Sequence, residues 1–199
     1  MATPASLLES ELRRDGARPL ITAYDGDGNR VELSVTTVAN WVAKTAGYLM
    51  DELGLEPGDP LAIDPTLHWL TAVALLAGWT VGAEVRPESN PDAARLEVPL
   101  DPMGAGFSRV VAAYPDRYVP SSPSGQAEVA AAPDLPAGAR VLTTLPLDDL
   151  GIGLGLLGPL AAGGSAVFAT GPGDLEAMTA AERVTHTAGV DVAGLPRLG

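Results

Sequence analysis

Two long stretches without a charged residue constrain the fold of this chain most strongly. They cover residues 65–83 and 150–173, and both reach the length of a membrane-spanning helix. Acidic residues flank each stretch on both sides, whereas spanning helices usually carry Lys or Arg on one flank. The second stretch also holds eight glycines and two prolines. These features favour buried helix-plus-strand units in the core of an α/β protein over membrane spans.

Strand-like and helix-like patterns alternate along the chain. A strand pattern within 56–64, a helix pattern at 65–79 that is apolar nearly all round, and a strand pattern at 80–88 predict a β-α-β unit. Such a unit implies parallel strands and a right-handed crossover. The alternation as a whole predicts a single α/β domain over residues 1–199, with a mostly parallel sheet and helices on both faces.

The remaining segments extend this α/β pattern. Turn formers at 25–29 predict a β-hairpin over 19–34, and apolar residues at three- and four-residue spacing predict a helix over 34–54. A Pro/Ala/Ser-rich loop is expected at about 119–139. Helices are further expected at 4–16, 106–116, 148–164 and 174–189, and strands at 94–100, 140–147, 165–170 and 190–196.

The composition excludes several classes of function. A net charge of −13, from 12 basic and 25 acidic residues, argues against nucleic acid, because a polyanion needs a basic face. Cysteine is absent, and the two histidines, His68 and His186, are far apart in sequence, so no metal site is expected. His68 is expected inside a buried helix, and His186 near an exposed helix end. Residues 1–15 lack the pattern of a signal peptide, which indicates a cytoplasmic protein.

Three segments, taken in order, share features with one enzyme family. Residues 31–63 contain a helix of small and apolar residues that ends at Leu-Gly, followed by Pro-Gly-Asp and a strand. Residues 69–89 contain a buried helix that leads into Gly-Ala, a strand and a proline. Residues 141–170 contain a strand, a helix ending in Pro-Leu-x-x-Gly-Gly, and another strand. The chain therefore resembles the N-terminal subdomain of AMP-dependent, adenylate-forming enzymes of the acyl-CoA synthetase type.

The departures from that family concern its nucleotide chemistry. The resemblance implies a Ser/Thr/Gly-rich loop with a lysine that wraps the ATP phosphates. The corresponding interval has no lysine and carries Glu128, and the chain's one lysine, Lys44, lies in an early helix. The family's later nucleotide motifs are also absent from the sequence. We expect no catalytic residue and no metal ligand, and only weak candidates for cofactor binding: Ser121, Ser122, Ser124 and Gly125.

The sequence GLGLLG at residues 153–158 matches the G-x-G-x-x-G fingerprint of a dinucleotide-binding turn. The match uses Gly153, Gly155 and Gly158, and Asp174 lies where the ribose-binding acid would be. However, the segment PLDD lies between the preceding strand and the glycines, and Pro159 follows the last glycine directly. We expect these glycines within a packed helix, and Asp174 as a helix cap.

These features lead to three hypotheses of function. The first is a degenerate, non-catalytic relative of the acyl-CoA synthetases that acts as a binding or interaction module, as a homo-oligomer or with a partner protein. The second is residual binding of an acyl group or a nucleotide (ATP, AMP or CoA), as part of a split adenylate-forming enzyme. The third is an NAD(P)-binding protein that uses residues 153–158. No contact with nucleic acid or a membrane is expected.

Overall fold

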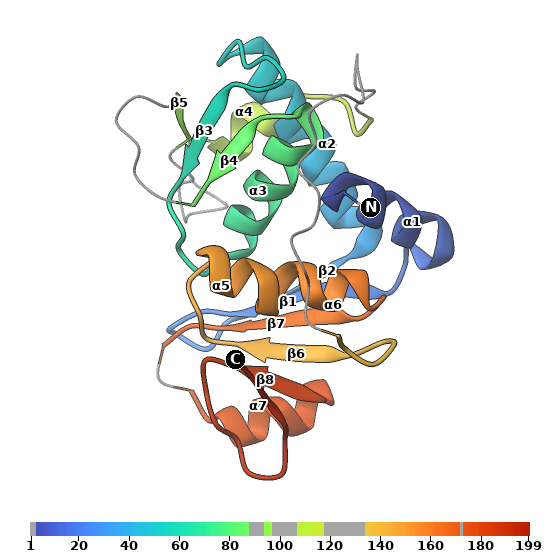
Figure 1. Cartoon of the computed structure of the whole chain (residues 1–199), viewed down its shortest axis with the longest axis vertical. Coiled ribbons are helices and arrows are strands. Elements are labelled where there is room, and N and C mark those ends of the chain that lie inside the picture. The colour runs from blue at the N-terminus through green and yellow to red at the C-terminus, as the bar shows by residue number, and fades with distance from the viewer. Residues whose placement is uncertain (1–2, 88–93, 97–106, 118–133, 172) are drawn as a thin grey trace.

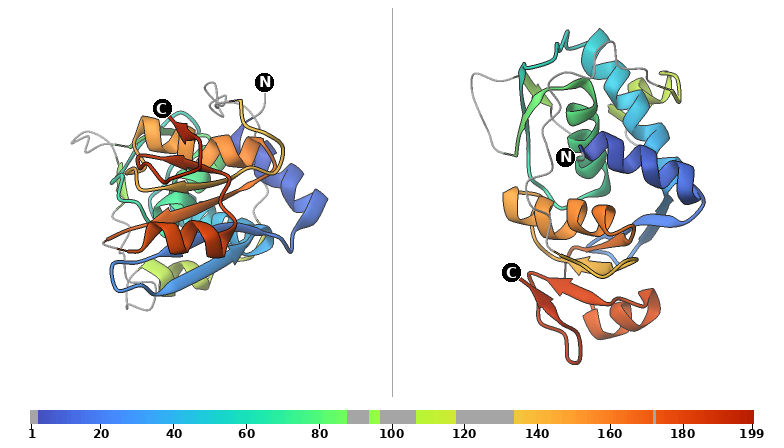
Figure 2. Two further views of the ribbon diagram at one scale, coloured as in Figure 1. Left: turned by 90° about the horizontal axis from the view of Figure 1, so that it is seen from below. Right: turned by 45° about the vertical axis from the view of Figure 1, so that its right-hand side comes forward.

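The fold is taken from a computed structural model of the chain, which describes residues 3–87, 94–96, 107–117, 134–171 and 173–199. It is a mixed α/β architecture in which a mostly parallel sheet has helices on both faces, as the sequence predicts (Figure 1). Helices α1 to α3 and the helical segment 149–161 lie on one side of the larger sheet. Helix α7 lies on the other side (Figures 1 and 2).

The larger sheet has six strands in the order β2-β1-β7-β6-β8-β9. Strands β1 and β2 form the predicted antiparallel hairpin, and the other neighbours in the sheet are parallel. In register, Ala23 of β1 lies between Val31 of β2 and Phe168 of β7. The strands are β1 (Pro19–Tyr24), β2 (Arg30–Ser34), β6 (Arg140–Thr143), β7 (Ser165–Ala169), β8 (His186–Ala188) and β9 (Arg197–Leu198).

The smaller sheet contains the predicted β-α-β unit. Strand β3 (Pro60–Ile63) leads through α3 (Trp69–Val81) to β4 (Glu84–Arg86), and β3 pairs in parallel with both β4 and β5 (Ala94–Leu96). Twelve of the thirteen residues of α3 are buried, because the helix lies between the smaller sheet and α2 (Val35–Asp51). Among the helices of the described residues, none has the length and apolarity needed to cross a membrane.

Two further helices pack around α2. Helix α1 (Pro4–Asp15) begins with Thr3 as its N-cap, in a reciprocal capping arrangement with Ser6. Helix α4 (Phe107–Ala112) is tied to α2 by Lys44, whose Nζ lies 2.9 Å from Asp116 Oδ1 and donates to the carbonyl oxygens of Ala112 and Tyr114. The chain's one lysine therefore has a structural role in this packing.

The GLGLLG sequence lies in a continuous helical segment, which confirms the packed helix expected for it. The segment consists of α5 (Asp149–Gly151), a π-helical turn (Ile152–Leu157) and α6 (Gly158–Ala161). Gly158 donates its N–H to Gly153 O, five residues earlier. Because Pro159 has no N–H to donate to Gly155 O, the regular α-helical ladder is interrupted at this point.

The last part of the chain differs from the sequence prediction. Helix α7 (Leu175–Glu182) begins at Asp174 as expected but ends at Glu182, because Arg183 adopts a left-handed conformation with φ of 52°. The residues after it include β-branched side chains, which favour extended structure, and His186–Ala188 forms β8 beside β6. The strand expected at 190–196 is not formed, and β9 follows it instead.

Candidate ligand-binding pocket

A pocket of about 330 Å³ lies between the larger sheet, the hairpin turn and the start of α3. We call it the β1–β7 pocket, because it opens at the carboxyl ends of these two parallel strands. Open α/β sheets commonly bind ligands at the carboxyl ends of their strands. Its lining residues are Ala23, Tyr24, Asp25, Asn29, Val31, Thr66, Leu67, His68, Trp69, Phe168 and Thr170.

The apolar part of the pocket follows from the register of the sheet. Val31, Ala23 and Phe168 are direct neighbours across three strands, so their side chains share one face. Leu67 and Trp69 lie opposite, at the start of α3. Trp69 is held by an edge-to-face contact with Trp41, with ring centroids 5.6 Å apart. The walls are therefore preformed by packed side chains.

Asp25 begins the hairpin turn, and its carboxylate is used to hold that turn. Oδ1 accepts hydrogen bonds from the backbone N–H groups of Asp27 and Asn29 at 3.0 and 2.8 Å, and Oδ2 accepts one from Asn29 Nδ2 at 2.8 Å. The side-chain hydrogen bond from Asn29, followed by its backbone N–H, lowers the pKa of Asp25. Asp25 is therefore ionised at neutral pH.

His68 differs from its predicted position within a buried helix. It is the N-cap of α3, is only half-buried, and its Nδ1 accepts the Leu70 N–H at 3.1 Å. This bond places the ring proton of neutral His68 on Nε2. Burial lowers the pKa of His68, so the neutral form is favoured at pH 7.

The mouth of the pocket is fixed by Thr170. Its N–H and its hydroxyl both donate to Tyr24 O, at 3.1 and 2.9 Å. The Thr66 hydroxyl donates to Asp64 Oδ1. Both threonine hydroxyls therefore donate their hydrogen bond to another group of the protein, but they retain lone pairs that can accept a hydrogen bond.

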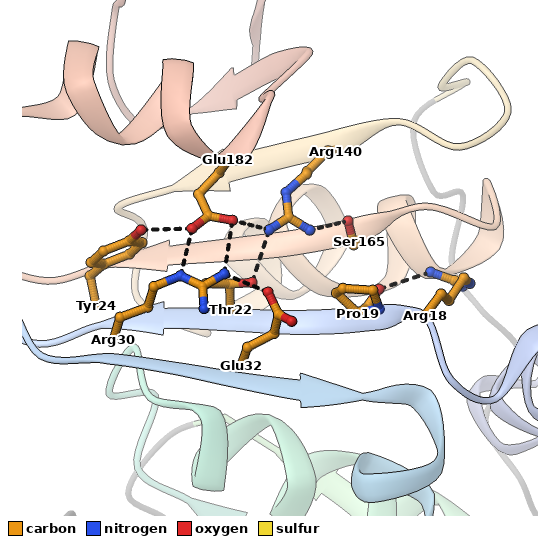
Figure 3. A network of polar contacts seen from close by, with 9 residues as sticks. All are labelled: Arg18, Pro19, Thr22, Tyr24, Arg30, Glu32, Arg140, Ser165 and Glu182. Carbon is orange, nitrogen blue, oxygen red and sulfur yellow. Dashed lines mark hydrogen bonds and ion pairs between the residues drawn. The ribbon is translucent and has the colours of Figure 1, made fainter.

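The opposite face of the same strands carries an ion-pair network (Figure 3). Glu182 of α7 accepts hydrogen bonds from Tyr24 Oη at 2.6 Å and from Arg30 Nε at 2.7 Å, and forms an ion pair with Arg140. The Arg140 guanidinium also donates hydrogen bonds to Ser165 Oγ and Thr22 Oγ1, both at 2.9 Å. The Tyr24 hydroxyl and the Arg30 guanidinium are thus directed to this network.

The charged network alters the ionisation of its members. Burial by itself raises the pKa of Glu182, but hydrogen bonds from Arg30, Tyr24 and Arg140 outweigh it and lower that pKa to about 2. Burial, followed by the hydrogen bond to Glu182, raises the pKa of Tyr24. The network is therefore ionic at neutral pH and ties α7 to strands β1, β2 and β6.

A larger hollow of about 570 Å³ lies between β4 and the start of α5. Its described lining includes Glu84, Asp148 and Asp149, and Arg86 in this lining is paired with Glu84 at 3.5 Å. Asp148 is the N-cap of α5 and accepts the Gly151 N–H at 2.9 Å. The lining of this hollow includes Pro87, the last described residue before a gap in the description, so we give preference to the β1–β7 pocket.

The residues singled out in the sequence are not brought together in one site. Ser121, Ser122, Ser124 and Gly125 lie outside the described residues. Gly153, Gly155 and Gly158 belong to the helical segment on one side of the larger sheet, whereas α7, which Asp174 caps by accepting the Ala177 N–H at 2.9 Å, is on the other. His186 lies in β8. Within the described ranges, no group of three or more His, Cys, Asp or Glu could hold a metal ion.

Sequence reasoning missed most of the pocket residues. Asp25 and Asn29 were assigned only to a turn, and Val31 and Phe168 only to strands. An Asp followed four residues later by Asn is a turn signal, whereas Val31 is exposed and Phe168 lies in a strand that is buried throughout, so strand alternation marks neither of them. Their position in a shared pocket depends on strand order, which the sequence did not supply.

Comparison with known proteins supports the fold and gives less about function. No family model matches the chain. A protein of Mycobacterium tuberculosis (strain ATCC 25618 / H37Rv), described as "TIGR03089 family protein", is 43% identical over 96 residues, which are 46% of this chain and 40% of that protein. The crystal structure of an acyl-CoA synthetase from Brucella canis superposes with a TM-score of 0.68 at 14% identity, covering 94% of this chain and 47% of that one. The chain thus matches less than half the length of either protein, and it shares with the synthetase an α/β fold with a mostly parallel, helix-flanked sheet.

Proposed function

We propose that this chain is a non-catalytic ligand-binding module with an acyl-CoA synthetase-like fold, and that the β1–β7 pocket is its binding site. One observation carries the proposal. The pocket has preformed apolar walls, while the titratable side chains at its rim are already held in structural hydrogen bonds. Its volume of about 330 Å³ is at the lower end of the range of about 300–1,000 Å³ typical of small-molecule sites.

The engaged rim favours binding over proton transfer. A general acid or base needs a lone pair or a proton that can reach the substrate. Three lone pairs of the Asp25 carboxylate are used by the hairpin turn, and Nδ1 of His68 is used by the Leu70 N–H. The Tyr24 hydroxyl is directed to Glu182 on the other face of the sheet. Using an engaged lone pair of Asp25, Nδ1 of His68 or the Tyr24 hydroxyl for chemistry would break a hydrogen bond that holds the local fold, whereas the His68 Nε2–H is not engaged in this way.

The likeness to an acyl-CoA synthetase bears on the choice of ligands to test. Fold alone does not define function, and the identity to the synthetase is 14%. Acyl-CoA, ATP, AMP and CoA therefore belong in the screen as outcomes that would favour a split adenylate-forming enzyme. NAD(P)H belongs there because of the GLGLLG sequence.

The test is a thermal-shift screen of the whole chain. The compounds are these cofactors and a set of small apolar molecules that fit the pocket volume. A ligand that binds the folded chain raises the unfolding midpoint by mass action. Each ligand found is titrated against the wild type, Val31→Phe and Val110→Phe. Val31 is 39% exposed at the pocket, and Val110 is 43% exposed on α4, so the two variants add the same group in two places.

We expect a small apolar ligand whose affinity falls at least tenfold in Val31→Phe and stays unchanged in Val110→Phe. Equal affinity in both variants for every ligand found would refute the pocket as the site. Pyrophosphate exchange with ATP and any carboxylic acid would refute the non-catalytic assignment, and it would favour the split-enzyme hypothesis instead. A shift with NAD(P)H that Val31→Phe leaves intact would also contradict the proposal.

A further inference from the structure

The charge of the β1–β7 pocket restricts the chemistry of its ligand. Among the eleven described residues that line it, Asp25 alone carries a charge at neutral pH, and none of them is Lys or Arg. Arg30 is next to Val31 in sequence but points to the other face, where Glu182 and Glu32 engage its guanidinium. Within the described part of the chain, the rim of the pocket is therefore negative and no basic side chain of the lining neutralises it.

The hydrogen-bonding capacity of the pocket has the same bias. The hydroxyl of Thr66 donates a hydrogen bond to Asp64, and that of Thr170 donates one to Tyr24 O. Both hydroxyls can therefore only accept a hydrogen bond from a ligand. Asn29 donates a hydrogen bond from one of its two amide N–H groups to Asp25. The Asp25 carboxylate accepts three hydrogen bonds, and the Gly28 N–H also acts on it and lowers its pKa, so it faces a ligand mainly as a negative charge. The Asp25 charge and the threonine acceptors suit a ligand that donates, while the His68 Nε2–H and the second amide N–H of Asn29 are donors in the same lining.

Aromatic side chains complete the site. Trp69 and Phe168 line the pocket together with the His68 ring, which lies 5.7 Å from the Trp69 ring, centroid to centroid. Aromatic faces attract organic cations through their quadrupole, most strongly for Trp and more strongly where water is excluded. Trp69 is 5% exposed and Phe168 is 1% exposed, so each ring presents only a small part of its surface to the pocket.

We propose that the β1–β7 pocket binds a small organic amine in its ammonium form, with the ammonium group at Asp25 and the apolar part against Trp69 and Phe168. This inference rests on the proposed function and names the class of ligand. An ammonium group supplies donors and no acceptor, which complements the Asp25 carboxylate and the hydroxyl lone pairs of Thr66 and Thr170. The net charge of −13 further raises the local concentration of cations and lowers that of carboxylates and phosphates.

Three probes of one shape test this proposal: 2-phenylethylammonium, 2-phenylethanol and phenylacetate. They are titrated against the whole chain by isothermal calorimetry at neutral pH and low salt. We expect the ammonium compound to bind at least tenfold more tightly than the alcohol, and the carboxylate to bind most weakly. Val31→Phe should weaken the ammonium compound at least tenfold, and Val110→Phe should leave it unchanged.

A pair of charge variants on one turn isolates the role of Asp25. Asp25→Asn keeps the shape of the side chain and removes its charge, and Asp27→Asn removes an equal charge from an exposed neighbour. We expect Asp25→Asn to remove the preference for the ammonium compound over the alcohol, and Asp27→Asn to retain it. Retention of the preference in both variants would overturn the role of Asp25.

The outcomes separate this inference from the proposed function. If the alcohol or the carboxylate binds as tightly as the ammonium compound and Val31→Phe abolishes that binding, the pocket is a binding site but the amine inference is wrong. If the probes do not bind at millimolar concentration while another ligand from the screen depends on Val31, the amine inference is again overturned and the proposed function stands. If Val31→Phe changes the affinity of no ligand, both the amine inference and the proposed function are refuted.

Discussion

The hydroxyl of Tyr24 lies 2.6 Å from a carboxylate oxygen of Glu182, although the two residues are 158 positions apart in the chain. This bond joins the first strand of the larger sheet to helix α7 (Figure 3). Glu182 also forms ion pairs with Arg30 and Arg140. This one buried carboxylate therefore connects the hairpin, the centre of the sheet and helix α7. The β1–β7 pocket lies on the other face of the same strands.

Replacing Glu182 by Gln should destabilise the chain strongly. The substitution keeps the shape of the side chain but leaves Arg140, whose side chain is 15% exposed, without its counter-charge. Breaking a buried ion pair from one side costs about 3–5 kcal/mol. Because Arg30 is 41% exposed and can return to water, we expect a loss of roughly 3 kcal/mol in the free energy of unfolding. Urea denaturation followed by circular dichroism measures it.

Glu176→Gln is the matched control, since Glu176 lies exposed on the same helix. It should change the free energy of unfolding by no more than about 0.5 kcal/mol. A loss for Glu182→Gln as small as that of the control would mean that the network is not coupled to folding.

Stability should fall with acidification in a window set by Glu182. Its pKa is about 2 in the folded chain against an ordinary value of 4.5. Since the folded pKa is lowered, the stabilisation is complete above about pH 5 and is lost as the pH falls towards 2, by roughly 3 kcal/mol. Asp25, whose pKa is also lowered, adds to the loss in the same direction. Unfolding free energies measured between pH 7 and 2.5 test this.

The same titration of Glu182→Gln separates the contribution of this residue. The variant should be less stable at pH 7 but should show a flatter dependence between pH 5 and 2.5, where the two proteins converge. Parallel curves over this range would place the acid sensitivity in other carboxylates.

A side chain at Gly155 should strain the contact between the π-helical turn and β6. A Cβ atom there would lie 2.8 Å from Thr143 Cγ2 and 3.1 Å from Thr143 Cβ, which is buried. Gly155→Ala should therefore cost about 1–3 kcal/mol, as overpacking of a core typically does. Gly153→Ala, two residues earlier in the same turn, has nothing within 4 Å of its Cβ. It should be neutral, or stabilising by up to about 1 kcal/mol through helix propensity.

Differential scanning calorimetry of the two variants compares them directly. Equal midpoints would show that close packing of Gly155 against Thr143 does not explain the glycine there. A midpoint that falls for Gly153→Ala alone would contradict the packing described for the segment.

The sequence carried most of the local structure but little of the pocket or the network. The turn formers at 25–29 predicted the hairpin, and the apolar run at 65–79 predicted the β-α-β unit, because these signals are local. The pocket joins residues 23–31 to 66–69 and 168–170, and the Glu182 network joins the hairpin to Arg140 and Glu182, far along the chain. Such sites depend on strand order and register, which no local pattern encodes. The end of α7 was missed because Arg183 adopts a conformation that usually signals glycine.

That conformation provides a last prediction. Arg183 ends α7 with φ of 52°, and among the described residues it is the one non-glycine residue with a positive φ. A non-glycine residue pays about 1–2 kcal/mol in this region, whereas glycine adopts it freely but loses more entropy on folding. Because the Arg183 side chain is exposed, Arg183→Gly should raise the unfolding free energy by about 0.5–1 kcal/mol. Arg183→Ala removes the same side chain and keeps the strain, so it should give no gain. Urea denaturation of both variants decides the matter, and an equal gain in the two would assign the effect to the arginine side chain instead of the backbone.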